Sequence, residues 1–111
     1  MLAEYLMPDH YLVITSWPDL EGARQQADAL LQKKLAARVN ILPQMESMYH
    51  WKGEIRHGRE HKIFIKTSAS RIGSLQREIR AAHPYAVAEI LQFRIDSGDP
   101  DYLDWIMQST Q

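Results

Sequence analysis

The spacing of apolar residues divides the first part of the chain into a strand and a helix. Tyr11 to Thr15 is a compact apolar, β-branched run, typical of a strand buried on both faces. After Pro18, apolar residues recur every three or four positions from Leu20 to Leu35, which predicts one amphipathic helix. Asp19 precedes this stripe and is suited to accept a hydrogen bond from a backbone N–H at the start of the helix.

The period changes to two in the middle of the chain. The alternation from Val39 to Trp51 predicts an unusually long strand, bent at Pro43 or at Gly53. His57-Gly58 is expected to form a turn, after which Ile63 to Ile65 returns as the partner strand of a long hairpin.

The last third of the chain repeats the alternation of helix and strand. A second apolar stripe from Ile72 to Ala82 predicts a helix that starts at Ser70 and is ended by Pro84. Val87 to Ile95 reads as a strand, and Tyr102 to Met107 reads as a short terminal helix after a turn at Gly98-Asp99-Pro100. The order β-α-β-β-α-β predicts one α+β domain over residues 1–111. The fold expected from this order is ferredoxin-like, with an antiparallel sheet that carries two helices on one face.

The uncovered face of that sheet predicts self-association. In a monomer this face should be polar, but Leu91 and Phe93 lie on one side of the last strand and the long strand is also rich in apolar residues. Contiguous exposed apolar surface is typical of a subunit interface, although such residues also occur as ordinary exposed hydrophobics. Tyr and Trp suit subunit contacts, with core packing as the alternative role. We expect four of them to make such contacts: Tyr49, Trp51, Tyr102 and Trp105.

Composition narrows the functional classes. The chain of 111 residues has 13 basic and 14 acidic residues, which disfavours the concentrated positive surface of a nucleic-acid-binding protein. It has no cysteine, so it contains no disulfide and no thiolate metal ligand. No stretch approaches the ~20 apolar residues of a membrane span. Residues 1–8 contain Glu4 and lack the features of a signal peptide, so we expect a cytoplasmic protein.

Several segments, in their order and spacing, resemble the CutA (divalent-cation tolerance) family over nearly the whole chain. They include Thr15-Ser16-Trp17-Pro18, Lys34 to Ile41, Ser47 to Gly53, His83-Pro84-Tyr85 and Tyr102 to Ile106. The resemblance implies a homotrimer of ferredoxin-like subunits, similar in architecture to the PII signalling proteins, with a role in tolerance of divalent metals, chiefly copper. Two positions depart from the family pattern. Arg38 stands where members commonly carry cysteine, and Ala88 stands where many carry proline.

His83 and Glu89 match family positions proposed as metal ligands, so the resemblance implies a site for Cu(II) or another divalent ion. Imidazole and carboxylate would also suit Zn(II) or Ni(II), and the missing thiolate removes the donor that favours Cu(I). A structural role is the alternative to metal binding for both residues. Positive charge on His83 would suit the end of the second helix, and Glu89 among apolar residues would need a basic or hydrogen-bonding partner.

No catalytic motif or cofactor motif is apparent, and we expect a non-enzymatic protein that requires no cofactor. His50, His57 and His61 read as solvated polar residues near a loop. The alternative function is PII-like signalling or small-molecule binding in clefts between subunits. Five residues are candidates to line such clefts: Lys66, Arg71, His83, Tyr85 and Glu89.

Overall fold

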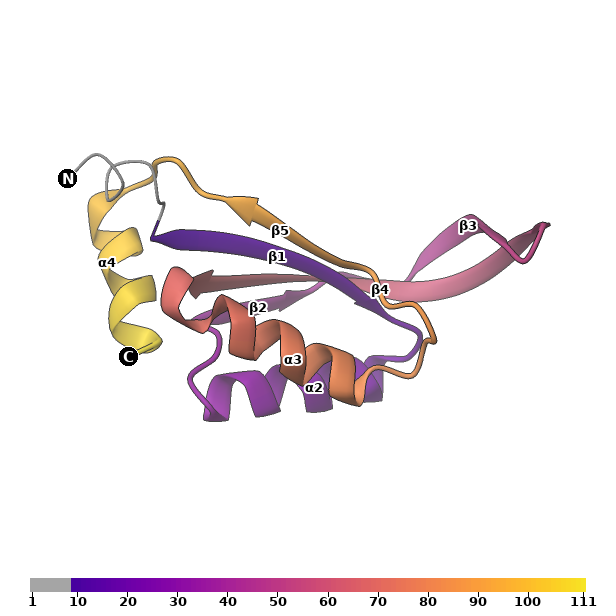
Figure 1. Cartoon of the computed structure of the whole chain (residues 1–111), viewed down its shortest axis with the longest axis horizontal. Helices are drawn as coiled ribbons and strands as arrows, with labels where there is room; N and C mark the ends of the chain where they lie inside the picture. The colour runs from indigo at the N-terminus through magenta and orange to yellow at the C-terminus, as the bar shows by residue number, and fades with distance from the viewer. Residues whose placement is uncertain (1–8) are drawn as a thin grey trace.

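The computed structural model describes residues 9–111, so the expectation about residues 1–8 lies outside the described residues. Five strands, three α-helices and a short 3-10 turn follow one another in this range (Figure 1). They are β1 (His10–Trp17), α2 (Leu20–Gln32), β2 (Arg38–Ile41), β3 (Met45–Trp51), β4 (Glu54–Ser68), the turn Ala69–Arg71, α3 (Ile72–Ala82), β5 (Ile90–Arg94) and α4 (Pro100–Ser109). The predicted ferredoxin-like α+β fold is confirmed.

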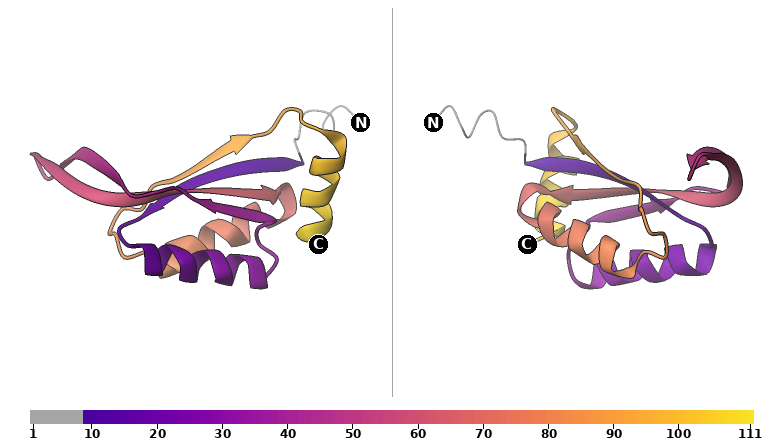
Figure 2. Two further views of the ribbon diagram at one scale, coloured as in Figure 1. Left: turned by 180° about the vertical axis from the view of Figure 1, so that it is seen from behind. Right: turned by 45° about the vertical axis from the view of Figure 1, so that its right-hand side comes forward.

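The sheet is antiparallel, with strand order β2-β4-β1-β5. α2 and α3 lie side by side on one face, and α4 packs at the end of the sheet where β1 begins (Figures 1 and 2). β3 pairs with the outer half of β4, and this hairpin leaves the sheet at the opposite end and twists strongly (Figure 2). The described chain therefore measures 49 Å along its longest axis but only 24 Å along its shortest.

The core lies between the sheet and the two helices. Alternate residues of the two central strands, such as Val13, Ile63 and Ile65, are buried against Leu30 of α2 and Leu75 of α3. The cap predicted for α2 is confirmed, since the Asp19 carboxylate accepts from Gly22 N–H at 2.8 Å.

The middle of the chain confirms one sequence prediction and contradicts another. The long strand breaks at residues 42–44 into β2 and β3, which confirms the predicted bend at Pro43. The predicted turn at His57-Gly58 is wrong, because β4 runs straight through both residues and Gly58 pairs with Ser47. The chain turns instead at Lys52-Gly53, where φ is 50° and 79°. Positive φ at both central residues is the type I′ geometry that matches the twist of a hairpin.

The last strand is shorter than predicted, because β5 begins at Ile90 and residues 87–89 lie outside it. Thr15 of β1 is the last residue to pair with β5, and the next carbonyl, that of Ser16, accepts a hydrogen bond from the His83 side chain. β1 is also less enclosed than predicted, since Leu12 and Ile14 are only half-buried.

The face of the sheet opposite the helices, here called the open face, carries a continuous apolar patch. Leu91 of β5 pairs with Ile14 of β1, which pairs with Phe64 of β4, and Phe93 pairs with Leu12 in the next row. Leu91 and Phe93 remain 48% and 45% exposed. The predicted apolar surface on this face is therefore confirmed. Between residues 9 and 111, no helix is long and apolar enough to cross a membrane.

Candidate functional site

A cleft of about 780 Å³ lies between the β3–β4 hairpin and residues 84–89, which join α3 to β5. This volume is in the range of small-ligand sites. Its lining combines aromatic side chains of the hairpin with charged side chains of β4 and the connecting segment, including Tyr49, Trp51, Glu60, Lys62 and Glu89. The cleft is therefore the principal candidate site in the described part of the chain.

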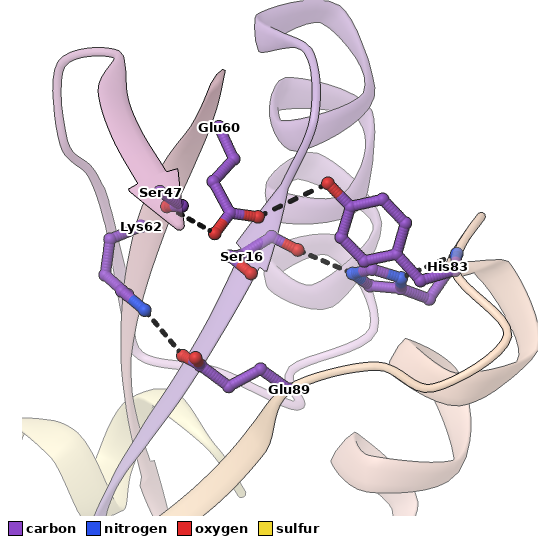
Figure 3. Close-up of polar contacts among 7 residues, drawn as sticks. Ser16, Ser47, Glu60, Lys62, His83 and Glu89 are labelled. Atoms are coloured by element: carbon purple, nitrogen blue, oxygen red, sulfur yellow. Dashed lines mark hydrogen bonds and ion pairs between the residues drawn. The ribbon is translucent and has the colours of Figure 1, made fainter. Parts of the chain in front are cut away.

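One wall of the cleft carries an ion pair between two distant elements. The Lys62 ammonium of β4 donates to Glu89 Oε2 at 2.7 Å, with side chains 25% and 36% exposed (Figure 3). Lys62 lies on β4, an inner strand of the sheet, where it pairs with Ser16 of β1, and Glu89 lies just before β5. A part-buried carboxylate needs such a partner, and Lys62 supplies it.

A second carboxylate, Glu60, joins the hairpin to the connecting segment. Its Oε1 accepts from the Ser47 hydroxyl at 2.8 Å, and its Oε2 accepts from the Tyr85 hydroxyl at 3.3 Å (Figure 3). Burial of the phenol, and then the negative charge of Glu60 and its hydrogen bond, raise the pKa of Tyr85 to about 12. Tyr85 is therefore held as a neutral donor to Glu60 over the physiological pH range.

His83 follows α3 and has both ring nitrogens engaged. Nε2 lies 2.5 Å from the Ser16 carbonyl oxygen, and Nδ1 accepts from the Tyr85 backbone N–H at 3.1 Å. Because a carbonyl only accepts, the hydrogen is on Nε2 and the imidazole is neutral in this arrangement. The ring also packs against Trp17 and Tyr85, at centroid distances of 5.0 and 4.9 Å. The expected interaction of a charged His83 with the helix end is thus replaced by contacts to β1 and to the connecting segment.

The fold and this geometry can be compared with known proteins. The family model of the CutA1 divalent ion tolerance protein matches residues 11–109. The chain belongs to the CutA1 divalent ion tolerance protein family.

Individual CutA proteins support the assignment. The chain is 40% identical to Protein CutA of Mus musculus over 94 residues, which cover 85% of this chain and 53% of the mouse protein. It is 38% identical to the Divalent-cation tolerance protein CutA of Thermus thermophilus over 99 residues, which cover 89% and 96% of the two chains. The crystal structure of CutA from Xylella fastidiosa matches with a TM-score of 0.90 and 35% identity, over 93% of this chain and 99% of that one. The chain thus spans about half of the mouse relative and nearly all of the bacterial ones.

The names of CutA relatives give different locations. The Arabidopsis thaliana protein is described as chloroplastic, and the Archaeoglobus fulgidus protein is described as periplasmic. Location varies within the family, and a cytoplasmic location for this chain stays a prediction.

The fold separates the other residues that were expected to line CutA clefts. Lys66 lies on the open face and donates to the Asn40 side chain at 3.1 Å. Arg71 donates to the Thr110 carbonyl at 2.7 Å, beside the C-terminal end of α4. Neither lines the cleft within one protomer, whereas Tyr85 and Glu89 do.

The four residues expected at a CutA subunit interface fall into two groups. Tyr49 and Trp51 lie on the hairpin and line the cleft. Tyr102 and Trp105 lie together on α4 with ring centroids 5.6 Å apart, and the Arg38 guanidinium lies 5.9 Å from the Trp105 ring. The hairpin and α4 are at opposite ends of the described chain (Figure 1).

Metal-ligating groups are sparse in the part of the chain that the structure describes. Residues 9–111 contain no group of three or more His, Cys, Asp or Glu side chains that could hold a metal ion. Glu60 and Glu89 line the same cleft, but His83 is occupied by Ser16 and Tyr85. His50 and His57 are exposed on the hairpin as expected, whereas the expectation for His61 is wrong. This histidine is buried, with Nδ1 2.9 Å from the Leu42 carbonyl oxygen.

Lys62, Glu60 and Ser47 were not singled out from the sequence as site residues. Lys62 and Glu89 are 27 positions apart, so only the register of the strands brings them together. Alternation along β4 would have placed Lys62 on the same face as Phe64, but nothing local identifies Glu89 as its partner.

Proposed function

We propose that this chain forms a homotrimer that acts in divalent-cation tolerance by binding a divalent cation through Glu89 in the cleft. The observation that carries the proposal is that Glu89 and Glu60, two carboxylates, line one accessible cleft. Carboxylate oxygens suit hard and borderline divalent ions, and the chain has no thiolate for Cu(I). The family to which the chain belongs is described by divalent ion tolerance.

The proposal narrows the ligand set expected from the sequence. His83 would have to break two hydrogen bonds before either ring nitrogen could bind a metal, so we assign it a positioning role. To bind a metal ion, the Glu89 carboxylate would have to break one hydrogen bond, the one it accepts from Lys62. Because one protomer supplies two carboxylates at most, water or groups of a neighbouring subunit complete the coordination shell.

The trimer rests on apolar surface that one protomer leaves uncovered. The open face presents Leu91 and Phe93. The β3–β4 hairpin presents Met48 and Ile55, and each of these two residues is about two-thirds exposed. Such surface is rare on monomers and typical of interfaces. Light scattering on a sizing column should give three times the protomer mass. Phe93→Asp should lower this mass, whereas Gln25→Asp on the exposed side of α2 should not. A monomeric wild-type protein would overturn the assembly.

Calorimetry tests the metal site. Titration of the purified protein with Zn(II) and with Cu(II) should show saturable binding, and Glu89→Gln should weaken it by roughly tenfold or more. Glu78→Gln is the matched control, since Glu78 forms a similar ion pair with Lys33 at 2.8 Å on the helix layer. Equal affinity in wild type and Glu89→Gln, or no binding by the wild type, would refute the site.

A second candidate function is the binding of a small molecule in the same cleft, as in PII-like signalling. The volume of about 780 Å³ and the aromatic lining favour it. A thermal-shift series separates the two, because the occupied protein unfolds at a higher temperature. Stabilisation by Zn(II) but not by nucleotides supports the metal site, and the reverse supports signalling. Neither function requires catalysis, and none of the relatives named above carries the name of an enzyme.

A further inference from the structure

The Lys62 ammonium is bound to one oxygen of the Glu89 carboxylate, the group proposed to bind the cation. Its Nζ lies 2.7 Å from Glu89 Oε2, which is a charge-assisted hydrogen bond in a part-buried setting. Both partners line the cleft, so an incoming ion meets a carboxylate that is already paired with the positive charge of Lys62. Metal and ammonium therefore compete for the same carboxylate.

We propose that Lys62 is a built-in competitor that sets the cation concentration at which Glu89 is occupied. This inference rests on the proposed function of Glu89 as a metal ligand. When only a fraction of the carboxylates is free of Lys62, the apparent affinity for the metal falls by that fraction. A strongly coordinating ion displaces the ammonium, whereas a weakly coordinating one does not. The pair thus suits a protein that responds to excess divalent metal and stays empty at basal levels.

The cleft has room for the Lys62 ammonium when a metal ion displaces it from Glu89. A lysine head group is a mobile point charge on a flexible four-carbon stem, and the Lys62 side chain is one-quarter exposed toward the cleft. Its backbone is fixed, because its carbonyl accepts from Leu42 N–H and its Cα is in register with Ser16. Displacement consequently moves a side chain and leaves the sheet intact.

A purely structural Lys62 would behave in the opposite way. If the ion pair served only to hold residues 84–89 against the sheet, its removal would loosen the segment that carries Glu89. Metal binding would then weaken or stay the same, because a less ordered ligand costs more to fix. The two roles therefore predict opposite signs for a variant that lacks the charge.

The experiment is calorimetric titration of the trimer with Zn(II). Lys62→Met keeps an unbranched apolar side chain and removes the charge, and it should bind Zn(II) roughly three- to tenfold more tightly than wild type. Lys62→Arg keeps the charge and offers a bidentate partner to the carboxylate, so it should bind Zn(II) no more tightly than wild type. Lys33→Met breaks the similar pair with Glu78 and should leave the affinity unchanged. Combining Lys62→Met with Glu89→Gln should abolish the gain.

The outcomes separate this inference from the function on which it rests. If wild type binds Zn(II) and Lys62→Met binds it equally or more weakly, the competitor role is overturned and the Glu89 site stands. If neither binds, both fail together. Circular dichroism confirms that Lys62→Met is folded, and Lys62→Gln takes its place in the titration if it is not.

Discussion

His83→Ala tests most sharply whether this histidine positions the site or binds metal. The ring joins β1 to the connecting segment through hydrogen bonds to the Ser16 carbonyl and the Tyr85 N–H. Each is worth about 1 kcal/mol. Its contacts with Trp17 and Tyr85 add about 1 kcal/mol. The variant should therefore lose about 3 kcal/mol of unfolding free energy per protomer, since Ser16 is buried and water does not replace the bond fully.

Urea denaturation measures this loss, with all proteins at one concentration because the stability of an oligomer depends on it. His57→Ala is the control, since His57 is exposed on the hairpin, and it should stay within about 0.5 kcal/mol of wild type. In calorimetry, His83→Ala should weaken Zn(II) binding by no more than about threefold, because it removes no ligand and acts only through the order of the segment that carries Glu89. Unchanged stability together with lost metal binding would refute the reasoning and make His83 a ligand.

Three further predictions follow from local geometry. Gly22→Ala should lower the unfolding free energy by about 1–2 kcal/mol in urea denaturation, because the new Cβ would lie 2.6 Å from Trp17 Cε3 and overpacking outweighs the gain in helix propensity. Gly53→Ala should cost about 1 kcal/mol, since φ is +79° but no atom lies within 4 Å of the new Cβ; a loss above about 3 kcal/mol would contradict this. The folded-state pKa of Tyr85 is raised from 10.0 to about 12, so its contribution to stability is present below about pH 10 and is lost as the pH rises toward about 12. Absorbance titration should show one phenol ionising near pH 12 that Tyr85→Phe lacks, and its persistence in the variant would refute the assignment.

The local elements of the fold could be predicted because they follow from neighbouring residues. The cap at Asp19 and the stripe of α2 depend on spacings of three and four positions, which the sequence displays directly. The exposed apolar side of β5 follows in the same way from alternation, and Leu91 and Phe93 lie on the open face as expected.

The hairpin turn could not be located because two X-Gly pairs interrupt the same alternating pattern. Lys52-Gly53 and His57-Gly58 both suit a tight turn by composition. The choice depends on pairing along the whole of β4, where Gly58 faces Ser47 in the ladder. The polar network of the cleft could not be predicted from the sequence for a related reason. His83 meets Ser16 across 67 positions, and this contact depends on how the completed sheet places the segment after α3.

The Glu89 site is tested most directly by a crystal structure of the trimer soaked in Zn(II), with data collected at the zinc absorption edge. We expect an anomalous peak in the cleft within coordination distance of the Glu89 carboxylate, with the Lys62 side chain moved away from it. A peak that lies away from the Glu89 carboxylate, or no peak in the cleft, would contradict the role of Glu89 as the cation ligand.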